Sequence, residues 1–356
     1  MLDFTSALYL GMHHPSETLE PWEQFTTGMP AALETPDRAR ALASNLADLQ
    51  GCEQATLGTS TLHLFWDLFG MLAGEGVAIY MDDGVYPIAR WGIERAAAQG
   101  VRVRSFPHHD GKTLRRLLER DASSRLRPVV VVDGYCPGCA RPAPLVAYWK
   151  SAQEFGGYLI MDDTQALGVF GHGPGNALPY GSGGGGMLRW HDLKDRHVLV
   201  ISSLAKGFGV PVAALAGSRT AIECFEQRSE TSMHCSPPSN AVLSALAHAF
   251  AVNKGCGDAL RRRLANLVGH FRNGLRAGGF TATGGLFPIQ TIEALRAGRT
   301  AEIHESLAGL GVKAILRRDH SGTGLRLSFI LNARHTHEMI DLAVRRLAQA
   351  TAAANE

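Results

Sequence analysis

The sequence has no excess of charge of one sign and no long apolar run. Its 35 Lys and Arg residues nearly balance 33 Asp and Glu residues, leaving a formal net charge of +2 over 356 residues. Nucleic-acid-binding proteins usually carry a strongly basic patch, so this balance argues against a nucleic-acid partner. The apolar runs are too short for a transmembrane helix, and the N-terminus lacks the basic and apolar regions of a signal peptide. We therefore expect a cytoplasmic protein without a membrane partner.

Cysteine is also scarce, with six residues in the chain. This number is not typical of a secreted disulfide framework, and we expect the cysteines to be reduced. Two of them form the motif Cys136-Pro-Gly-Cys139 at the end of a predicted strand. Such spacing occurs in redox pairs and in half of a zinc site, but we find no second C-x-x-C motif or spaced Cys/His pair. We interpret the motif as a turn lined by two small apolar residues.

Short apolar runs alternate with amphipathic stretches over most of the first 218 residues. The runs are QATLG, VAIYMDD, VRVRSF, PVVVVDGY, GYLIMDD, HVLVISS and VAALAGS. Strands in alternation with helices predict βαβ units. We therefore expect an α/β fold with a mainly parallel central sheet and helices on both faces.

The chain is predicted to have three parts. These are an N-terminal segment (residues 1–36) that packs on the small domain or a partner subunit, a large domain (37–240) and a small C-terminal α+β domain (241–356). Near the second boundary, the patterns predict two separate helices, Asn240 to Val252 and Leu260 to Ala277.

Two further patterns indicate surface structure. The stretch from Gly181 to Gly186 predicts a flexible loop, and its match to G-x-G-x-x-G is discarded because it does not follow a strand. The basic run from Arg261 to Arg263 predicts a solvated helix face, with contact to an anionic substrate as the alternative.

One lysine lies in an unusual setting. Lys206 follows the apolar run HVLVISS, and His197 is the only other ionisable residue between Arg196 and Arg219. A lysine without a nearby partner is costly there, unless burial lowers its pKa so that it serves as an amine nucleophile. The alternative is a structural lysine that extends its ammonium group to solvent.

An aspartate strengthens the nucleophile interpretation. Asp162 ends the run GYLIM, which places its carboxylate at the carboxyl edge of a parallel sheet, where such sheets bind ligands. A reactive lysine with a buried carboxylate is the pair that pyridoxal 5'-phosphate (PLP) requires, because the carboxylate holds the protonated pyridine nitrogen. Ser60 and Thr61 at a predicted helix start, together with Ser203, offer donors for its phosphate.

Three motifs, MDDTQALGVFGHGPG, SSLAKGFGVPVAALAGS and LDFTSALYLG, resemble those of the α-oxoamine synthases. These fold-type-I PLP enzymes include 8-amino-7-oxononanoate synthase, 2-amino-3-ketobutyrate ligase and 5-aminolevulinate synthase. The resemblance implies that Lys206 binds the cofactor covalently and that Asp162 pairs with its ring nitrogen. It also implies that Tyr86 stacks on the ring and that Ser60, Thr61 and Ser203 contact the phosphate.

The resemblance has further implications for assembly and substrate. It implies a homodimer whose segment MHCSPPSN reaches the partner subunit's phosphate site. It also implies that Arg326, in GLRLSF, binds the carboxylate of an amino-acid substrate.

The sequence departs from the family pattern at several points. Gln165 stands where the family usually has a histidine, so it can hydrogen-bond the phenolic oxygen of the cofactor but cannot shuttle a proton. Tyr86 likewise replaces a histidine, and TTGMPAALETP replaces a Gly/Ser-rich segment, which bears on the acyl-CoA contacts.

Two enzymatic hypotheses follow, and one non-catalytic alternative. The first is a decarboxylative Claisen-type condensation of an amino acid with an acyl thioester. The second is transamination of an amino acid to a keto acid, and the third is a cofactor-binding protein without catalysis. The sequence leaves the amino acid, the acyl donor and the metabolic context open.

Overall fold

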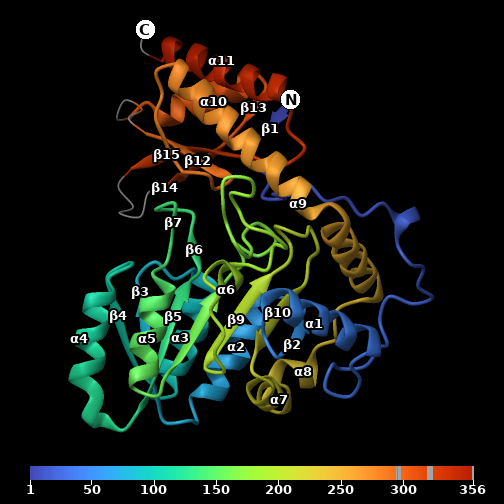
Figure 1. The fold of residues 1–356 in the computed structure, drawn as a ribbon, viewed down its shortest axis with the longest axis vertical. Helices are drawn as coiled ribbons and strands as arrows, with labels where there is room; N and C mark the ends of the chain where they lie inside the picture. Colours follow the sequence, from blue (N-terminus) through green and yellow to red (C-terminus); the bar gives the residue numbers. More distant parts are fainter. Residues whose placement is uncertain (294, 296–297, 319–323, 355–356) are drawn as a thin grey trace.

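The computed structural model describes residues 1–293, 295, 298–318 and 324–354. Figure 1 shows a large lower domain built on a twisted sheet and a smaller upper domain, joined by one long helix. Among the described helices, none is both long and apolar enough to cross a membrane.

A seven-stranded sheet forms the centre of the large domain. In spatial order its strands are β2 (Gln54–Gly58), β10 (Ala213–Gly217), β9 (Val198–Ser203), β8 (Tyr158–Asp162), β5 (Arg127–Asp133), β3 (Val77–Asp82) and β4 (Arg102–Phe106). Only β10 runs antiparallel to its neighbours, β2 and β9. The expected α/β fold with a mainly parallel sheet is therefore confirmed.

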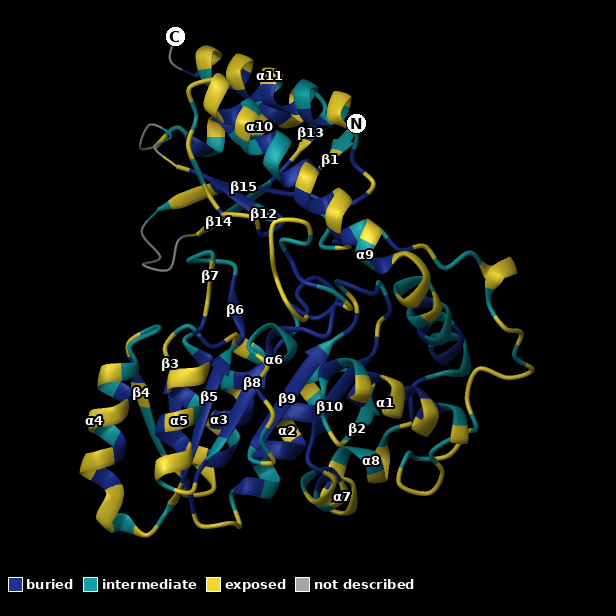
Figure 2. Ribbon diagram, viewed as in Figure 1, coloured by how far each residue is buried: buried dark blue, intermediate teal, exposed yellow. Residues whose placement is uncertain are grey.

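Both faces of the inner strands of this sheet are buried, as the dark blue colour of these strands in Figure 2 shows. Along β5, Val129 and Val131 join one apolar cluster with helices α2 (Thr61–Leu72), α3 (Pro87–Ala98) and α7 (Arg219–Arg228). Val130 and Val132 join the cluster on the opposite face, which contains residues of α1 (Asp37–Gln50), α4 (Gly111–Asp121) and α5 (Leu145–Glu154). Continuous β-branched runs suit strands covered on both faces, because successive side chains alternate between them.

The small domain is an α+β unit. Its sheet has the order β11 (Ala282–Thr283), β12 (Ile289–Ile292), β15 (Leu325–Ile330) and β14 (Ile315–Arg318), and it is accompanied by α10 (Thr300–Gly309) and α11 (His337–Ala353). The N-terminal strand β1 (Leu2–Asp3) pairs in parallel with β13 (Val312–Lys313). The first residues of the chain thus pack on the small domain, where Phe4 stacks on His335 with ring centroids 4.3 Å apart.

The expectation of two separate helices near residue 250 is wrong. A single helix, α9 (Asn240–Ala277), spans the whole region and continues through Gly255 and Gly257. Gly257 is needed there, since a Cβ atom would lie 2.8 Å from Nη2 of Arg261. The two glycines interrupt the apolar pattern without ending the helix, and Gly257 makes room for the buried Arg261.

That arginine corrects the loop assignment and part of the helix-face assignment, since Arg262 and Arg263 are exposed as predicted. Arg261 is only 1% exposed, and its guanidinium donates hydrogen bonds to the Gly168 carbonyl oxygen (2.8 Å), to Oδ1 of Asn253 (2.9 Å) and to Oδ1 of Asp258 (2.7 Å). Asp258 in turn accepts a hydrogen bond from the Gly183 amide at 2.9 Å. The 181–186 segment is therefore fixed against α9 and largely buried, rather than a flexible surface loop.

We predict that Arg261→Met lowers the free energy of unfolding by about 1–3 kcal/mol, because it leaves the Gly168 carbonyl without its charged donor. Urea unfolding at fixed protein concentration measures this change. Arg262→Met is the matched control, since Arg262 is exposed and its loss is expected to change stability by less than about 0.5 kcal/mol. Equal unfolding midpoints for the two variants would contradict the role given to Arg261.

Candidate active site

Polar side chains gather at the carboxyl edge of the large sheet. Asp133 is the last residue of β5, Asp162 the last of β8 and Ser203 the last of β9. Asp133 and Asp162 are direct neighbours in the parallel register. Two carboxylates thus lie side by side at the edge where open α/β sheets bind ligands.

Both carboxyl groups are in a poorly solvated environment. Burial raises the pKa of Asp162, although the Thr164 amide donates to its Oδ1 at 2.9 Å and Lys206 attracts it. Burial and the neighbouring Asp162 raise the pKa of Asp133 well above its ordinary value, against a hydrogen bond from the Tyr86 amide at 3.2 Å. A cationic group bound here would relieve this cost.

Lys206 lies in the turn that follows β9. Burial lowers the pKa of its amine, while Asp162 and Asp133 oppose that change. A lowered pKa increases the fraction of neutral amine, which is the nucleophilic form. The structure therefore brings Lys206 and Asp162 to one site.

The predicted phosphate-binding residues lie at the same edge. Ala213 of β10 pairs with Gly58 on one side and with Ser203 on the other. The carboxyl ends of β2 and β9 therefore lie at the same edge of the sheet. Ser60 follows β2 as the N-cap of α2, and Thr61 is the first residue of that helix. Backbone N–H groups and hydroxyls at this helix start are suited to an anion.

Gln165 and Tyr86 border the same carboxylates. The Tyr9 hydroxyl donates to Oε1 of Gln165 at 2.6 Å, which leaves the amide NH2 group of Gln165 as its donor. Tyr86 is the N-cap of α3, and its side chain is 54% exposed while its amide reaches Asp133. An exposed ring at this position is available to stack on a ligand.

Arg326 lies elsewhere. It belongs to β15 of the small domain, opposite Arg317 of β14 in the antiparallel register. Its exposed side chain is thus carried by a different sheet from Asp162 and Lys206.

Sequence reasoning missed two residues of this site. Asp133 ends an apolar run as Asp162 does, so the same rule applied to PVVVVD finds it. Tyr9 gave no such signal, because it reaches Gln165 from a segment 156 positions away in the chain.

The chain belongs to the aminotransferase class I and II family, whose model matches residues 23–347. It is 31% identical to 8-amino-7-oxononanoate synthase of Alcanivorax borkumensis, over 98% of this chain and 88% of that protein. A second 8-amino-7-oxononanoate synthase, from Hydrogenovibrio crunogenus, is 26% identical over 98% of this chain and 87% of its own length. Within that family, the chain is an α-oxoamine synthase-type PLP enzyme.

Solved structures agree on the fold. Serine palmitoyltransferase from S. paucimobilis superposes with a TM-score of 0.85 at 18% identity, covering 99% of this chain and 88% of that one. For 8-amino-7-oxononanoate synthase from Francisella tularensis the TM-score is 0.77 at 16% identity, with 100% and 99% of the two chains covered. The fold-type-I architecture is therefore shared.

The residues present fit the PLP cofactor of this family. The buried Asp162 and the partly buried Asp133 form a pair of carboxyl groups with Lys206 as the cation that acts on both, so the edge favours one further positive group. A protonated pyridine nitrogen supplies such a group. The helix start at Ser60 and Thr61 suits the phosphate.

We predict that cofactor-free Asp162→Asn protein is more stable than cofactor-free wild type near pH 7, by about 1–3 kcal/mol. The raised pKa of Asp162 means that its contribution to stability is full below the ordinary carboxyl pKa of 3.8 and is lost as the pH rises through the folded-state pKa. The advantage of the variant should therefore grow from about pH 4 upward.

Thermal unfolding at several pH values measures this difference. Asp258→Asn is the control of opposite sign, because the pKa of Asp258 is lowered by its hydrogen bond from Arg261 in spite of burial. That variant should be less stable than the wild type above about pH 4, and this deficit should disappear as the pH falls below 4, through the lowered folded-state pKa of Asp258. If the wild type were more stable than Asp162→Asn near pH 7, ionisation of Asp162 would not destabilise the cofactor-free protein and the prediction would be wrong.

Proposed function

We propose that this enzyme condenses an α-amino acid with an acyl thioester, giving an α-amino ketone, CO2 and a free thiol. The observation that carries the proposal is the 31% identity to an 8-amino-7-oxononanoate synthase along nearly the whole chain. The juxtaposition of Lys206 and Asp162 supports it, because both residues are needed to use the cofactor. The particular amino acid and acyl group are not specified by these residues.

Each residue at the sheet edge has a role in this proposal. Lys206 holds the cofactor covalently, and its amine later removes the proton from the substrate Cα atom. Asp162 accepts a hydrogen bond from the pyridine nitrogen and keeps it protonated. When bound, PLP supplies an electron-accepting ring that stabilises a carbanion at Cα.

The remaining residues orient the ring and phosphate. Gln165 donates its amide N–H to the phenolic oxygen, with its carbonyl held by Tyr9. Tyr86 stacks on the ring, and Ser60, Thr61 and Ser203 bind the phosphate. Arg326 binds the substrate carboxylate through two parallel hydrogen bonds, a role in which the small domain contributes to the site.

Transamination is the second candidate, favoured by the family model and by two substitutions in the site. Gln165 and Tyr86 cannot exchange protons at neutral pH as histidines do, which leaves Lys206 to move every proton. Lys206 would then both remove and redeliver the proton, and PLP, when bound, would supply the electron-accepting ring that this proton transfer requires. Both candidates start from the same proton abstraction.

We further propose a cytoplasmic homodimer. Exposed apolar side chains support an interface where the N-terminal segment meets α8 (Glu230–His234): Leu33 is 75% exposed and Met233 61%. Backbone hydrogen bonds from Ala31 to Cys235 and from Ala32 to Ser232 join these two segments. Light scattering should give twice the mass of one chain, whereas a single-chain mass would exclude the dimer.

We predict that Lys206→Ala reduces turnover by at least about 100-fold, because no other group removes the Cα proton. The assay incubates the cofactor-loaded enzyme with a panel of amino acids, with and without acyl-CoA, and follows free thiol, CO2 and keto acid. Lys194→Ala is the matched control, since Lys194 is exposed and lies on the surface after α6 (Met187–Trp190).

The products separate the candidates. Thiol and CO2 formed only when both substrates are present support condensation. Keto acid formed from an amino acid alone supports transamination. Full activity of Lys206→Ala would contradict both proposals.

A further inference from the structure

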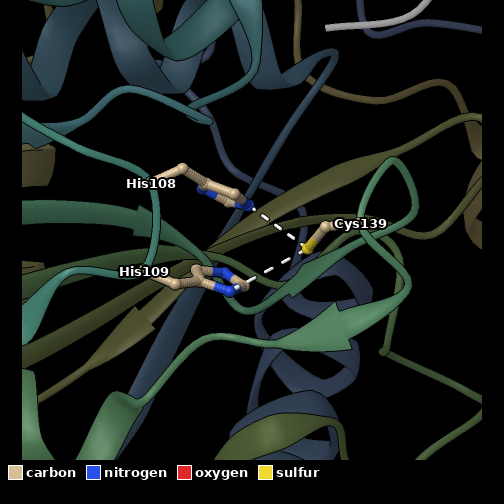
Figure 3. A group of neighbouring side chains, drawn as sticks. All are labelled: His108, His109 and Cys139. Atoms are coloured by element: carbon tan, nitrogen blue, oxygen red, sulfur yellow. Dashed lines mark hydrogen bonds between the residues drawn. The ribbon is translucent and has the colours of Figure 1, made fainter.

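A cluster of two histidines and one cysteine lies at the same sheet edge, beyond the cofactor carboxylates. His108 and His109 follow β4, and Cys139 lies in the loop between β6 (Tyr135–Cys136) and β7 (Arg141–Pro142), as Figure 3 shows. Nε2 of His108 is 3.3 Å from Sγ of Cys139, and Nδ1 of His109 is 3.9 Å from the same sulfur. One ligand atom from each residue falls within 4.8 Å of the others.

We propose that His108, His109 and Cys139 bind a zinc ion. Zinc bonds of about 2.0–2.1 Å to nitrogen and about 2.3 Å to sulfur, at tetrahedral angles, place nitrogen and sulfur ligands about 3.6 Å apart. The two observed distances, 3.3 and 3.9 Å, lie on either side of that value. Imidazole with thiolate is a ligand set that selects zinc over calcium or magnesium, which prefer oxygen.

Asp82 supports both histidines from behind. This residue ends β3 and is 1% exposed; its Oδ1 atom lies 2.6 Å from Nδ1 of His108. Its Oδ2 atom accepts the backbone amide of His109 at 2.9 Å. A carboxylate that holds one ring nitrogen leaves the lone pair of the other for a metal, and zinc-binding histidines are usually supported in this way.

The backbone around the cluster also serves this arrangement. At Gly84, a Cβ atom would lie 2.1 Å from Nδ1 of His108, so only glycine admits the imidazole here. His109 has φ +61°, a conformation that residues other than glycine rarely adopt. The nitrogen of His109 that faces Cys139 is Nδ1, while the other ring nitrogen, Nε2, is buried without a hydrogen-bond partner.

Three protein ligands leave the fourth zinc position to water or another small ligand. Cys136 is not one of the three, because it lies outside the group whose ligand atoms fall within 4.8 Å of one another. A zinc site with an open position is typical of exchangeable, rather than purely structural, metal centres. In this proposal the C-x-x-C motif contributes one ligand, carried by the turn at residues 137–140 that the sequence predicted.

The site is separate from the proposed cofactor site but adjacent to it. Asp82 and Asp133 end neighbouring strands of the sheet, and Asp82 and His108 both act on the pKa of Asp133. Bound zinc would fix the β6–β7 hairpin to the loop after β4, beside the cofactor carboxylates. The proposal does not depend on which reaction the enzyme catalyses, because its test measures metal content.

The test uses the full-length, PLP-loaded enzyme, incubated with zinc sulfate, desalted and analysed by elemental mass spectrometry. We expect about one zinc ion per chain in the wild type and less than about a tenth of that in Cys139→Ala and His108→Ala. Cys136→Ala and the remote Cys256→Ala, on exposed α9 surface, should retain the metal. Asp82→Asn should weaken zinc affinity by about 10–100-fold, measured by competition with a chromophoric chelator.

Two measurements distinguish loss of the zinc site from misfolding of a variant. The wild type itself must hold the metal, and its zinc-edge X-ray absorption should show one sulfur and two imidazole ligands. Far-ultraviolet circular dichroism compares the fold of each variant with the wild type. Four results would each overturn the three-ligand site. Two concern the metal in the wild type and the ligand variant: wild-type protein without stoichiometric zinc, or equal zinc in Cys139→Ala and wild type. The other two are loss of zinc from Cys136→Ala and a Cys136–Cys139 disulfide in the purified enzyme.

Discussion

The site depends on one constraint, which is a pair of poorly solvated carboxyl groups at one edge of the sheet, one of them buried and the other partly buried. Parallel strands place Asp133 and Asp162 side by side, and burial makes both expensive to ionise. Lys206 alone compensates them only in part, because its own charge is disfavoured by the same burial. The ionised carboxylates at this edge are unfavourable when no further cation is present and become favourable when a cationic ring binds beside them. Binding of the cofactor therefore stabilises this part of the fold.

The same edge continues to the neighbouring strand with a different outcome. Asp82 at the end of β3 is satisfied by His108, by the amides of Gly84 and His109 and by the Tyr148 hydroxyl. These hydrogen bonds lower the pKa of Asp82 despite its burial, whereas the pKa values of Asp133 and Asp162 are raised. Three aspartates in equivalent positions thus take different tasks according to the donors around them. Two lie at the proposed cofactor site, and the third, Asp82, holds the imidazole of His108 and the backbone amide of His109 beside Cys139.

Much of this architecture could be predicted from the sequence, and the exceptions have physical causes. The parallel sheet was predictable because strands buried on both faces are continuous apolar runs. Asp162 and Lys206 could be predicted as site residues because they lie at or just after the carboxyl ends of such strands. The continuity of α9 was not predictable, because Gly255 and Gly257 break its apolar pattern, and the reason for Gly257 is tertiary packing around Arg261. The cluster at Cys139 was missed because its histidines precede it by 30 residues or more and meet it only through the strand order.

The central claim is that Asp162 holds a positively charged ring nitrogen at the edge of the sheet. Nitrogen NMR of the enzyme loaded with ¹⁵N-labelled PLP tests it directly, because the chemical shift distinguishes a protonated from an unprotonated pyridine nitrogen. We predict a protonated nitrogen in the wild type and an unprotonated one in Asp162→Asn at the same pH. An unprotonated nitrogen in the wild type, or the same protonation in both proteins, would contradict the account.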